Sequence, residues 1–151
     1  MSILDIRVLG DPILRQSTVP VQEITDELRT LVADMFETMH HARGIGLAAP
    51  QVGRTERVCV VDVEGGKRPI VLVNPEIVSR SPAETKAEEG CLSIPDIFGD
   101  VTRPEQIVVR ALDREGAPFE LAATELLARC IQHEVDHLHG RGRDVEHSVF
   151  V

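Results

Sequence analysis

The feature that most constrains this sequence is the pentapeptide His133-Glu134-Val135-Asp136-His137, which lies in a stretch with helical periodicity. The pattern of residues 124–139 predicts an α-helix that Gly140 ends. Residues four apart project from one face of a helix, so the two histidines can bind one metal ion together. Glu134 lies one step round the helix, where its carboxylate can take a proton from a water molecule. This HExxH arrangement is typical of mononuclear zinc-type hydrolases.

A surface helix that carried two histidines and several acids by chance would have the same pentapeptide. The neighbouring residues argue against that interpretation, because they make the helix largely apolar and its polar residues then need partners. The apolar neighbours are Leu126, Leu127, Cys130, Ile131 and Leu138.

The other periodic segments predict an α+β fold. Apolar residues recur with a 3.6-residue period over 26–43, with Thr25 as N-cap and Gly44 as stop, and indicate an amphipathic N-terminal helix. The β-branched runs 57–63 and 69–73 predict two paired strands. Further strands are predicted at 107–112 and 119–122. This order indicates antiparallel β-sheets packed around the central metal-binding HExxH helix.

Two histidines leave a catalytic metal ion short of one protein ligand, since such sites usually have three. Downstream of His137 the sequence offers His139, Asp144, Glu146 and His147. The upstream candidate is Cys91, which follows a glycine and would be a strong ligand as a thiolate. A lone cysteine is more often an inert buried residue, and this default suits Cys59 and Cys130.

The segment 44–53 is rich in glycine and other small residues. It follows a predicted helix rather than a strand, so the context of a phosphate-binding loop is missing. Small residues suit a loop that lies against a substrate backbone, and Gln51 could donate a hydrogen bond to an oxyanion. Taken alone, the segment could equally be a turn packed for steric reasons.

Three segments together resemble the signatures of the peptide deformylase family, GxGxAAxQ, EGCxS and QHExDHLxG. The similarity extends from Ile3 through Gly140, and the three segments follow the family's order. They are Gly44-Ile45-Gly46-Leu47-Ala48-Ala49-Pro50-Gln51, Glu89-Gly90-Cys91-Leu92-Ser93 and Gln132-His133-Glu134-Val135-Asp136-His137-Leu138-His139-Gly140.

The resemblance implies a metal-dependent hydrolase that removes the N-formyl group from the N-terminal methionine of newly synthesised polypeptides and releases formate. The metal ligands would be Cys91, His133 and His137. Glu134 would take a proton from water and pass it to the leaving amine. Gln51 and the backbone N–H of Leu92 would stabilise the oxyanion.

The resemblance also implies that the peptide binds in extended form, paired like a strand with backbone groups of Ile45-Gly46 and Glu89-Gly90. Candidates for the wall of a methionine pocket are Leu126, Cys130 and Ile45. Ala87 and Arg129 fall where family members often have larger apolar residues. The stem of Arg129 could cover the pocket wall while its head reaches water.

Ligand chemistry alone suggests zinc for a Cys/His/His set. The resemblance implies Fe²⁺ in the cell, with Zn²⁺ or Ni²⁺ possible in purified protein. Family members usually continue after Gly140 into a C-terminal segment, often a helix, whereas here only residues 141–151 follow. Ribosome contact through such a segment is therefore not carried over.

Composition and charge argue against several other classes of protein, namely nucleic-acid-binding, secreted and membrane proteins. The 151 residues fit one domain, which the resemblance implies is a deformylase-like catalytic domain over residues 1–151. The net charge of −9 argues against direct nucleic-acid binding. The first residues lack the pattern of a signal peptide, and the cysteines are few and far apart. We expect a cytoplasmic monomer without membrane contact.

Two rival functions are weighed against this one. A general zinc metallopeptidase could use the same helix, but it would cut internal peptide bonds and would not need Cys91. A non-catalytic binder of nascent chains would need no metal ion. Neither accounts for the segments 44–51 and 89–93 together with the helix.

The acidic pair before Cys91 suggests one further contact. If Glu89 faces inward, it needs a cation, and Arg103 is the nearest arginine downstream. We predict a buried ion pair between these two residues. The alternative is that both acids, Glu88 and Glu89, are solvated.

Overall fold

The computed structural model describes residues 2–7, 11–91 and 94–140. Two α-helices and two short 3₁₀ segments are present in these ranges: η1 (Pro12–Arg15), α1 (Asp26–His41), η2 (Ala49–Val52) and α2 (Glu125–Leu138). The strands are β1 (Gly46–Ala48), β2 (Val58–Val61), β3 (Ile70–Arg80), β4 (Glu84–Cys91), β5 (Ile94–Pro104), β6 (Gln106–Leu112) and β7 (Pro118–Thr124).

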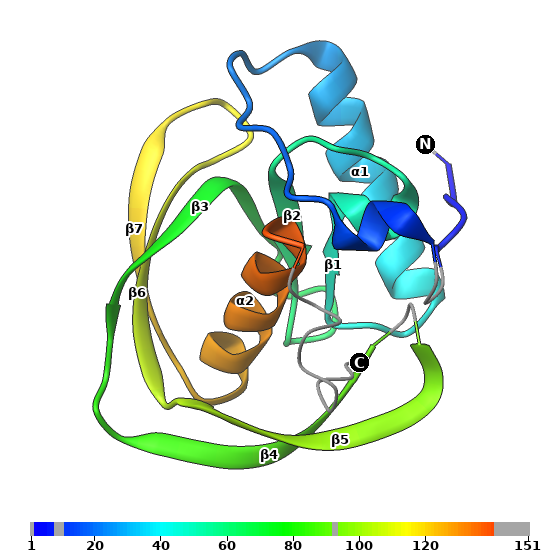
Figure 1. The fold of residues 1–151 in the computed structure, drawn as a ribbon. Coiled ribbons are helices and arrows are strands. Elements are labelled where there is room, and N and C mark those ends of the chain that lie inside the picture. The colour runs from blue at the N-terminus through cyan, green and yellow to red at the C-terminus, as the bar shows by residue number, and fades with distance from the viewer. Residues whose placement is uncertain (1, 8–10, 92–93, 141–151) are drawn as a thin grey trace.

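The strands form two antiparallel sheets around α2 (Figure 1). The larger sheet has five strands in the order β1-β2-β3-β6-β7, and β4 and β5 form a separate two-stranded sheet. Helix α2 lies in the middle of the fold, with the curved β6–β7 pair on one side and the β4–β5 hairpin across another. Antiparallel sheets with two helices confirm the predicted α+β class.

Strand β2 shows how the layers are built, because all four of its residues are buried. Side chains alternate between the two faces of a strand. Cys59 and Val61 accordingly join the core cluster that contains residues of α2, whereas Val58 and Val60 join the cluster that contains residues of α1. The β1–β3 part of the sheet is thus covered by a helix on each face, and α2 is held against a rigid, apolar wall.

Helix α1 begins at the predicted N-cap, and α2 begins within one residue of its predicted start. The Thr25 hydroxyl accepts a hydrogen bond from the N–H of Leu28 at 3.1 Å, and Thr124 stands at the N-cap of α2. Helix α1 ends at His41 and Arg43 then has a φ of 60°, so the backbone turns one residue before the predicted Gly44. Gly140 has a φ of 72° and ends α2 as predicted.

The sequence patterns missed the β4–β5 hairpin and the short strand β1. The strand β4 reads ETKAEEGC, with neither β-branched repetition nor apolar alternation, so its extended form comes from pairing with β5 rather than from its own preference. The predicted pair 57–63 and 69–73 is confirmed as β2 and β3, which are antiparallel. No helix within the described ranges is long and apolar enough to cross a membrane.

Candidate active site

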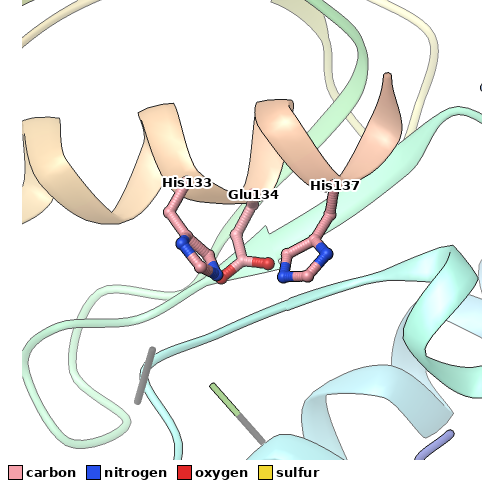
Figure 2. Close-up of side chains that lie close together, drawn as sticks. All are labelled: His133, Glu134 and His137. Carbon is pink, nitrogen blue, oxygen red and sulfur yellow. The ribbon is translucent and has the colours of Figure 1, made fainter. Parts of the chain in front are cut away.

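The pentapeptide of α2 brings three possible ligand side chains together. His133, Glu134 and His137 project from one side of the helix toward the neighbouring strand (Figure 2). One ligand atom from each lies within 4.8 Å of the others. The two imidazole rings meet edge to face, with centroids 4.6 Å apart. The predicted convergence of both histidines on one point is therefore confirmed, because residues one helical turn apart share a face.

Burial sets the protonation of these side chains. His133, Glu134 and His137 are 1%, 2% and 4% exposed. Desolvation lowers the pKa of His137 to about 4, and it lowers the pKa of His133 well below its ordinary value of 6.5, helped by His137 and Arg103. Both imidazoles are thus neutral near pH 7 and keep a lone pair for a metal ion. Desolvation also raises the pKa of Glu134 well above its usual range.

The other wall of the site is the edge strand β1. A Cβ atom added to Gly46 would lie 2.5 Å from Oε2 of Glu134 and 2.7 Å from Sγ of Cys130. The missing side chain at Gly46 is what lets α2 approach β1 so closely. The Cys130 thiol also faces the carbonyl oxygen of Ile45 at 3.5 Å. Three of the predicted substrate-binding residues, Ile45, Gly46 and Cys130, are therefore brought together beside Glu134.

Gln51 is held in a defined orientation by its own loop. Its side-chain Oε1 accepts a hydrogen bond from the N–H of Ala48 at 2.9 Å, and its carbonyl accepts one from the N–H of Arg7 at 2.6 Å. The 3₁₀ segment η2 that carries it packs against α2. Because Oε1 is engaged as an acceptor, Nε2 is the donor end of this buried amide.

Glu89 reaches the site from the β4–β5 hairpin. Its carboxylate accepts hydrogen bonds from Arg103 at 2.9, 3.1 and 3.2 Å, and its Oε1 lies 3.8 Å from Nδ1 of His133. The predicted ion pair between Glu89 and Arg103 is confirmed, and Glu89 is only 3% exposed. Arg103 also donates to Asp136 at 2.9 Å, which links the hairpin to α2.

Arg129 differs from its predicted placement. The sequence suggested a guanidinium that reaches water, but Arg129 is 8% exposed and its head donates to Glu89 and to backbone oxygens of the hairpin. The guanidinium of Arg129 can be buried because these acceptors replace the hydrogen bonds to water that it loses. The signal in the sequence was the position of Arg129 between Ala128 and Cys130, on a helix that is otherwise largely apolar there.

The remaining predicted residues lie at the ends of α2 and β4. Leu126 is on the first turn of α2 and is 49% exposed, one turn before Cys130 on the same face. Gly90 and Cys91 end β4, where Gly90 pairs with Phe98 and Cys91 pairs with Ile94. Leu92, proposed to offer an oxyanion donor, and the thiolate of Cys91 lie outside the described part of the chain.

The donors in the described ranges fit a divalent metal ion. Two neutral imidazoles converge, and a thiolate from the adjoining strand end would complete the three-ligand set usual for a catalytic site. Within the described residues, Oε1 of Glu134 is buried without a hydrogen-bond partner. A buried carboxylate oxygen of this kind is costly in an apolar core but useful beside a bound ion and water.

Comparison with known proteins identifies the arrangement. The family model described as polypeptide deformylase matches residues 3–142. A peptide deformylase from Alkalilimnicola ehrlichii is 54% identical over 143 residues, which cover 93% of this chain and 80% of that protein. The chain belongs to the peptide deformylase family. Another relative, the peptide deformylase from Hydrogenovibrio crunogenus, is 52% identical, covering 93% of this chain and 83% of its own length.

Solved structures agree with this assignment. The crystal structure of a peptide deformylase from Legionella pneumophila aligns with a TM-score of 0.90 at 48% identity, covering 98% of this chain and 83% of that one. The peptide deformylase from Thermotoga maritima aligns with a TM-score of 0.88 at 43% identity, covering 91% and 92%. Peptide deformylases are metal-dependent hydrolases that remove the N-formyl group from nascent polypeptides, and this chain is an enzyme of that kind.

Proposed function

We propose that this deformylase acts on N-formyl-methionyl peptides through one metal ion held by Cys91, His133 and His137. The observation that carries the proposal is the buried cluster of His133, Glu134 and His137, in which both histidines are neutral. A divalent ion bound there would polarise the formyl carbonyl and lower the pKa of a water molecule. The imidazoles and the thiolate would hold it and leave one position open for substrate.

Glu134 is proposed as the group that moves the proton. Its Oε1 is buried and without a hydrogen-bond partner among the described residues, and burial raises its pKa toward the range in which a carboxyl group both accepts and returns a proton. It takes a proton from the attacking water as oxygen bonds to the formyl carbon. When the carbon–nitrogen bond breaks, Glu134 gives the proton to the departing amine, and formate and a free amino terminus result.

Gln51 and the backbone N–H of Leu92 are proposed as oxyanion donors. The bond from the Ala48 N–H to Oε1 of Gln51 fixes the orientation of the amide, so that Nε2 is its donor end. A preoriented donor needs no rearrangement as negative charge develops on the formyl oxygen. This supports a direct role for Gln51 in the rate of the chemical step.

The substrate is proposed to lie between β1 and the end of β4. Backbone groups of Ile45, Gly46, Glu89 and Gly90 would pair with an extended peptide. Leu126 and Cys130, one turn apart on α2, would contact the methionine side chain. Since pairing uses the peptide backbone, residues after the methionine would have little influence on binding.

For the metal ion we propose Fe²⁺ in the cell and Zn²⁺ or Ni²⁺ in purified material, since imidazole and thiolate donors suit all three ions. We also propose a single catalytic domain that acts as a monomer in the cytoplasm, where newly made polypeptides carry the formyl group. The net charge of −9 argues against direct binding to nucleic acid.

The decisive experiment uses protein purified without oxygen and formyl-Met-Ala-Ser as substrate. We expect formate to be released from this peptide. Internal peptide bonds of unformylated peptides and the acetylated peptide should not be cut. Cys91→Ala should lose both metal ion and turnover, whereas Cys59→Ala should keep its metal content. A Cys91→Ala protein that keeps its metal ion would refute the proposed ligand set.

A further inference from the structure

The β4–β5 hairpin has little of its own to hold it in place. It forms a two-stranded sheet apart from the five-stranded one, and an isolated two-stranded hairpin is marginally stable in water. Its outward residues Lys86, Glu88 and Thr102 are exposed. A backbone hydrogen bond between Ser81 and Gln106 ties its base to β3 and β6, so the position of its far end depends on what its inner face contacts.

The inner face is defined by the register of the two strands. Thr85 pairs with Arg103, Ala87 pairs with Val101, and directly paired residues project to the same side. Of the inner residues, Val101 and Arg103 are buried and Ala87 is half-buried. This face meets α2, and the contact is made largely by buried charge.

Arg129 of α2 is bonded to both strands of the hairpin. Its Nη2 donates to the carbonyl and the hydroxyl oxygen of Thr85 in β4, at 2.7 and 3.1 Å. Its Nη1 donates to the carbonyl of Val101 in β5 at 2.8 Å and also to the carboxylate of Glu89. The planar guanidinium thus connects three residues of two strands with its two terminal nitrogens.

Arg103 makes the reverse connection, from the hairpin to Asp136 of α2. Both arginines bond to Glu89, so the charges of Glu89 and Asp136 are matched by those of Arg103 and Arg129. Thr85 and Glu89 flank Ala87 on the inner face, so Arg129 spans the position of Ala87.

We infer that Arg129 is a positioning residue that fixes the distance between the end of β4 and α2, and with it the approach of Cys91 to His133 and His137. The inference rests on the proposed ligand set. Arg129 bonds to Thr85, Glu89 and Val101 rather than to the reacting atoms. Its two-strand bonding keeps Glu89 beside His133 and holds the last residues of β4 at the site.

The test compares Arg129→Met and Arg129→Lys with the parent and with Arg110→Met as a matched control. Arg110 of β6 is exposed and pairs with Glu120 of the edge strand β7, away from the hairpin. Each protein is loaded with Co²⁺, whose thiolate charge-transfer absorption reports sulfur ligation. Metal release to a chelator and amide hydrogen exchange in β4 and β5 are then measured, with thermal unfolding to show that each variant is folded.

Arg129→Met should release cobalt about tenfold or more faster than the parent, as loss of a group supporting a metal ligand typically does. Amides of β4 and β5 should exchange faster, while those of β2 and β3 should not. Arg129→Lys keeps the charge but loses the planar set of guanidinium donors. It should therefore restore slow metal release and slow amide exchange only in part. This variant also carries the test if the methionine variant does not fold.

Two outcomes overturn the inference. One is metal release and hairpin exchange in Arg129→Met that stay within about twofold of the parent and of Arg110→Met. The other is full restoration by lysine, which would show that Arg129 only balances the charge of Glu89. If Cys91→Ala keeps the charge-transfer absorption, the proposed ligand set fails instead, and hairpin exchange still reports what Arg129 does.

Discussion

At the scale of single residues, the site depends on two imidazoles one helical turn apart, which burial keeps neutral near pH 7. The spacing of His133 and His137 was sufficient to predict that they converge. Their protonation was not predictable, because it depends on burial under β1 and the hairpin, which are distant in sequence. The same holds for Arg129, whose partners lie 28 to 44 positions away.

Glu134 should be separable from the metal ligands. Glu134→Gln should keep the metal ion near full occupancy and lose about 10²- to 10⁴-fold in rate, because only proton transfer is removed. His133→Ala should lose the metal ion and activity together, since two ligands hold a catalytic ion poorly. Metal content and formate release measured on the same samples distinguish the two effects. A Glu134→Gln protein without metal, or with parental turnover, would contradict the assigned role.

Gly46→Ala should harm turnover more than metal binding. The added methyl group would come within 2.5 Å of Oε2 of Glu134 and 2.7 Å of Sγ of Cys130, so the carboxylate has to move. Overpacking of this kind costs about 1–3 kcal/mol. We expect a lower kcat with near-normal metal content and a moderately lower melting temperature. Parental kcat in this variant would mean that Glu134 tolerates displacement.

At the scale of elements, predictability followed the strength of the local pattern. Both helices and the β2–β3 pair were found because their apolar residues repeat with the period of the element. The β4–β5 hairpin was missed because polar residues dominate β4, and its conformation is decided by pairing and by arginines. Strand β1, of three residues, is too short to carry a period.

Arg103→Met should weaken the connection between the hairpin and α2. Glu89 and Asp136 would each lose a charged partner, and breaking a buried ion pair on one side typically costs about 3–5 kcal/mol. We expect a lower free energy of unfolding in urea and faster loss of the metal ion to a chelator. Arg110→Met is the control, because that exposed pair should contribute little. Equal stability of the two variants would contradict a stabilising role for this buried ion pair.

At the scale of the whole molecule, the site is enclosed by elements that are far apart in the sequence. Helix α2 supplies the histidines, β1 and η2 supply the facing wall, and the hairpin closes a third side (Figure 1). Enclosure explains why the pKa of His133 and that of His137 fall while that of Glu134 rises. Such values belong to the assembled fold and to no single segment.

Acid should destabilise the metal-free protein through its histidines. The pKa of His137 is about 4 in the fold against 6.5 unfolded, so the unfolded chain binds more protons between these values. The free energy of unfolding should therefore fall as pH drops from about 6.5 toward 4, by about 3 kcal/mol from His137 alone.

Glu134 acts in the opposite direction, since its raised pKa removes stability as pH rises above its unfolded value of 4.5. The measurement is therefore made on Glu134→Gln, by urea unfolding at pH values between about 4 and 7. The parent, relative to this variant, should lose stability toward neutral pH. A free energy of unfolding that is flat with pH in Glu134→Gln would contradict the assigned histidine protonation.

Helix α2 follows every described strand along the chain, yet its side chains fill the centre that those strands surround. During synthesis the ribosome therefore releases the apolar inner faces of the strands before the helix that covers them exists. Until α2 emerges, a growing chain has core residues such as Leu72 and Ile107 without their cover, and it lacks His133 and His137. We therefore expect this deformylase to depend on chaperones from the time its strands emerge until α2 has formed, and to acquire its metal ion only then.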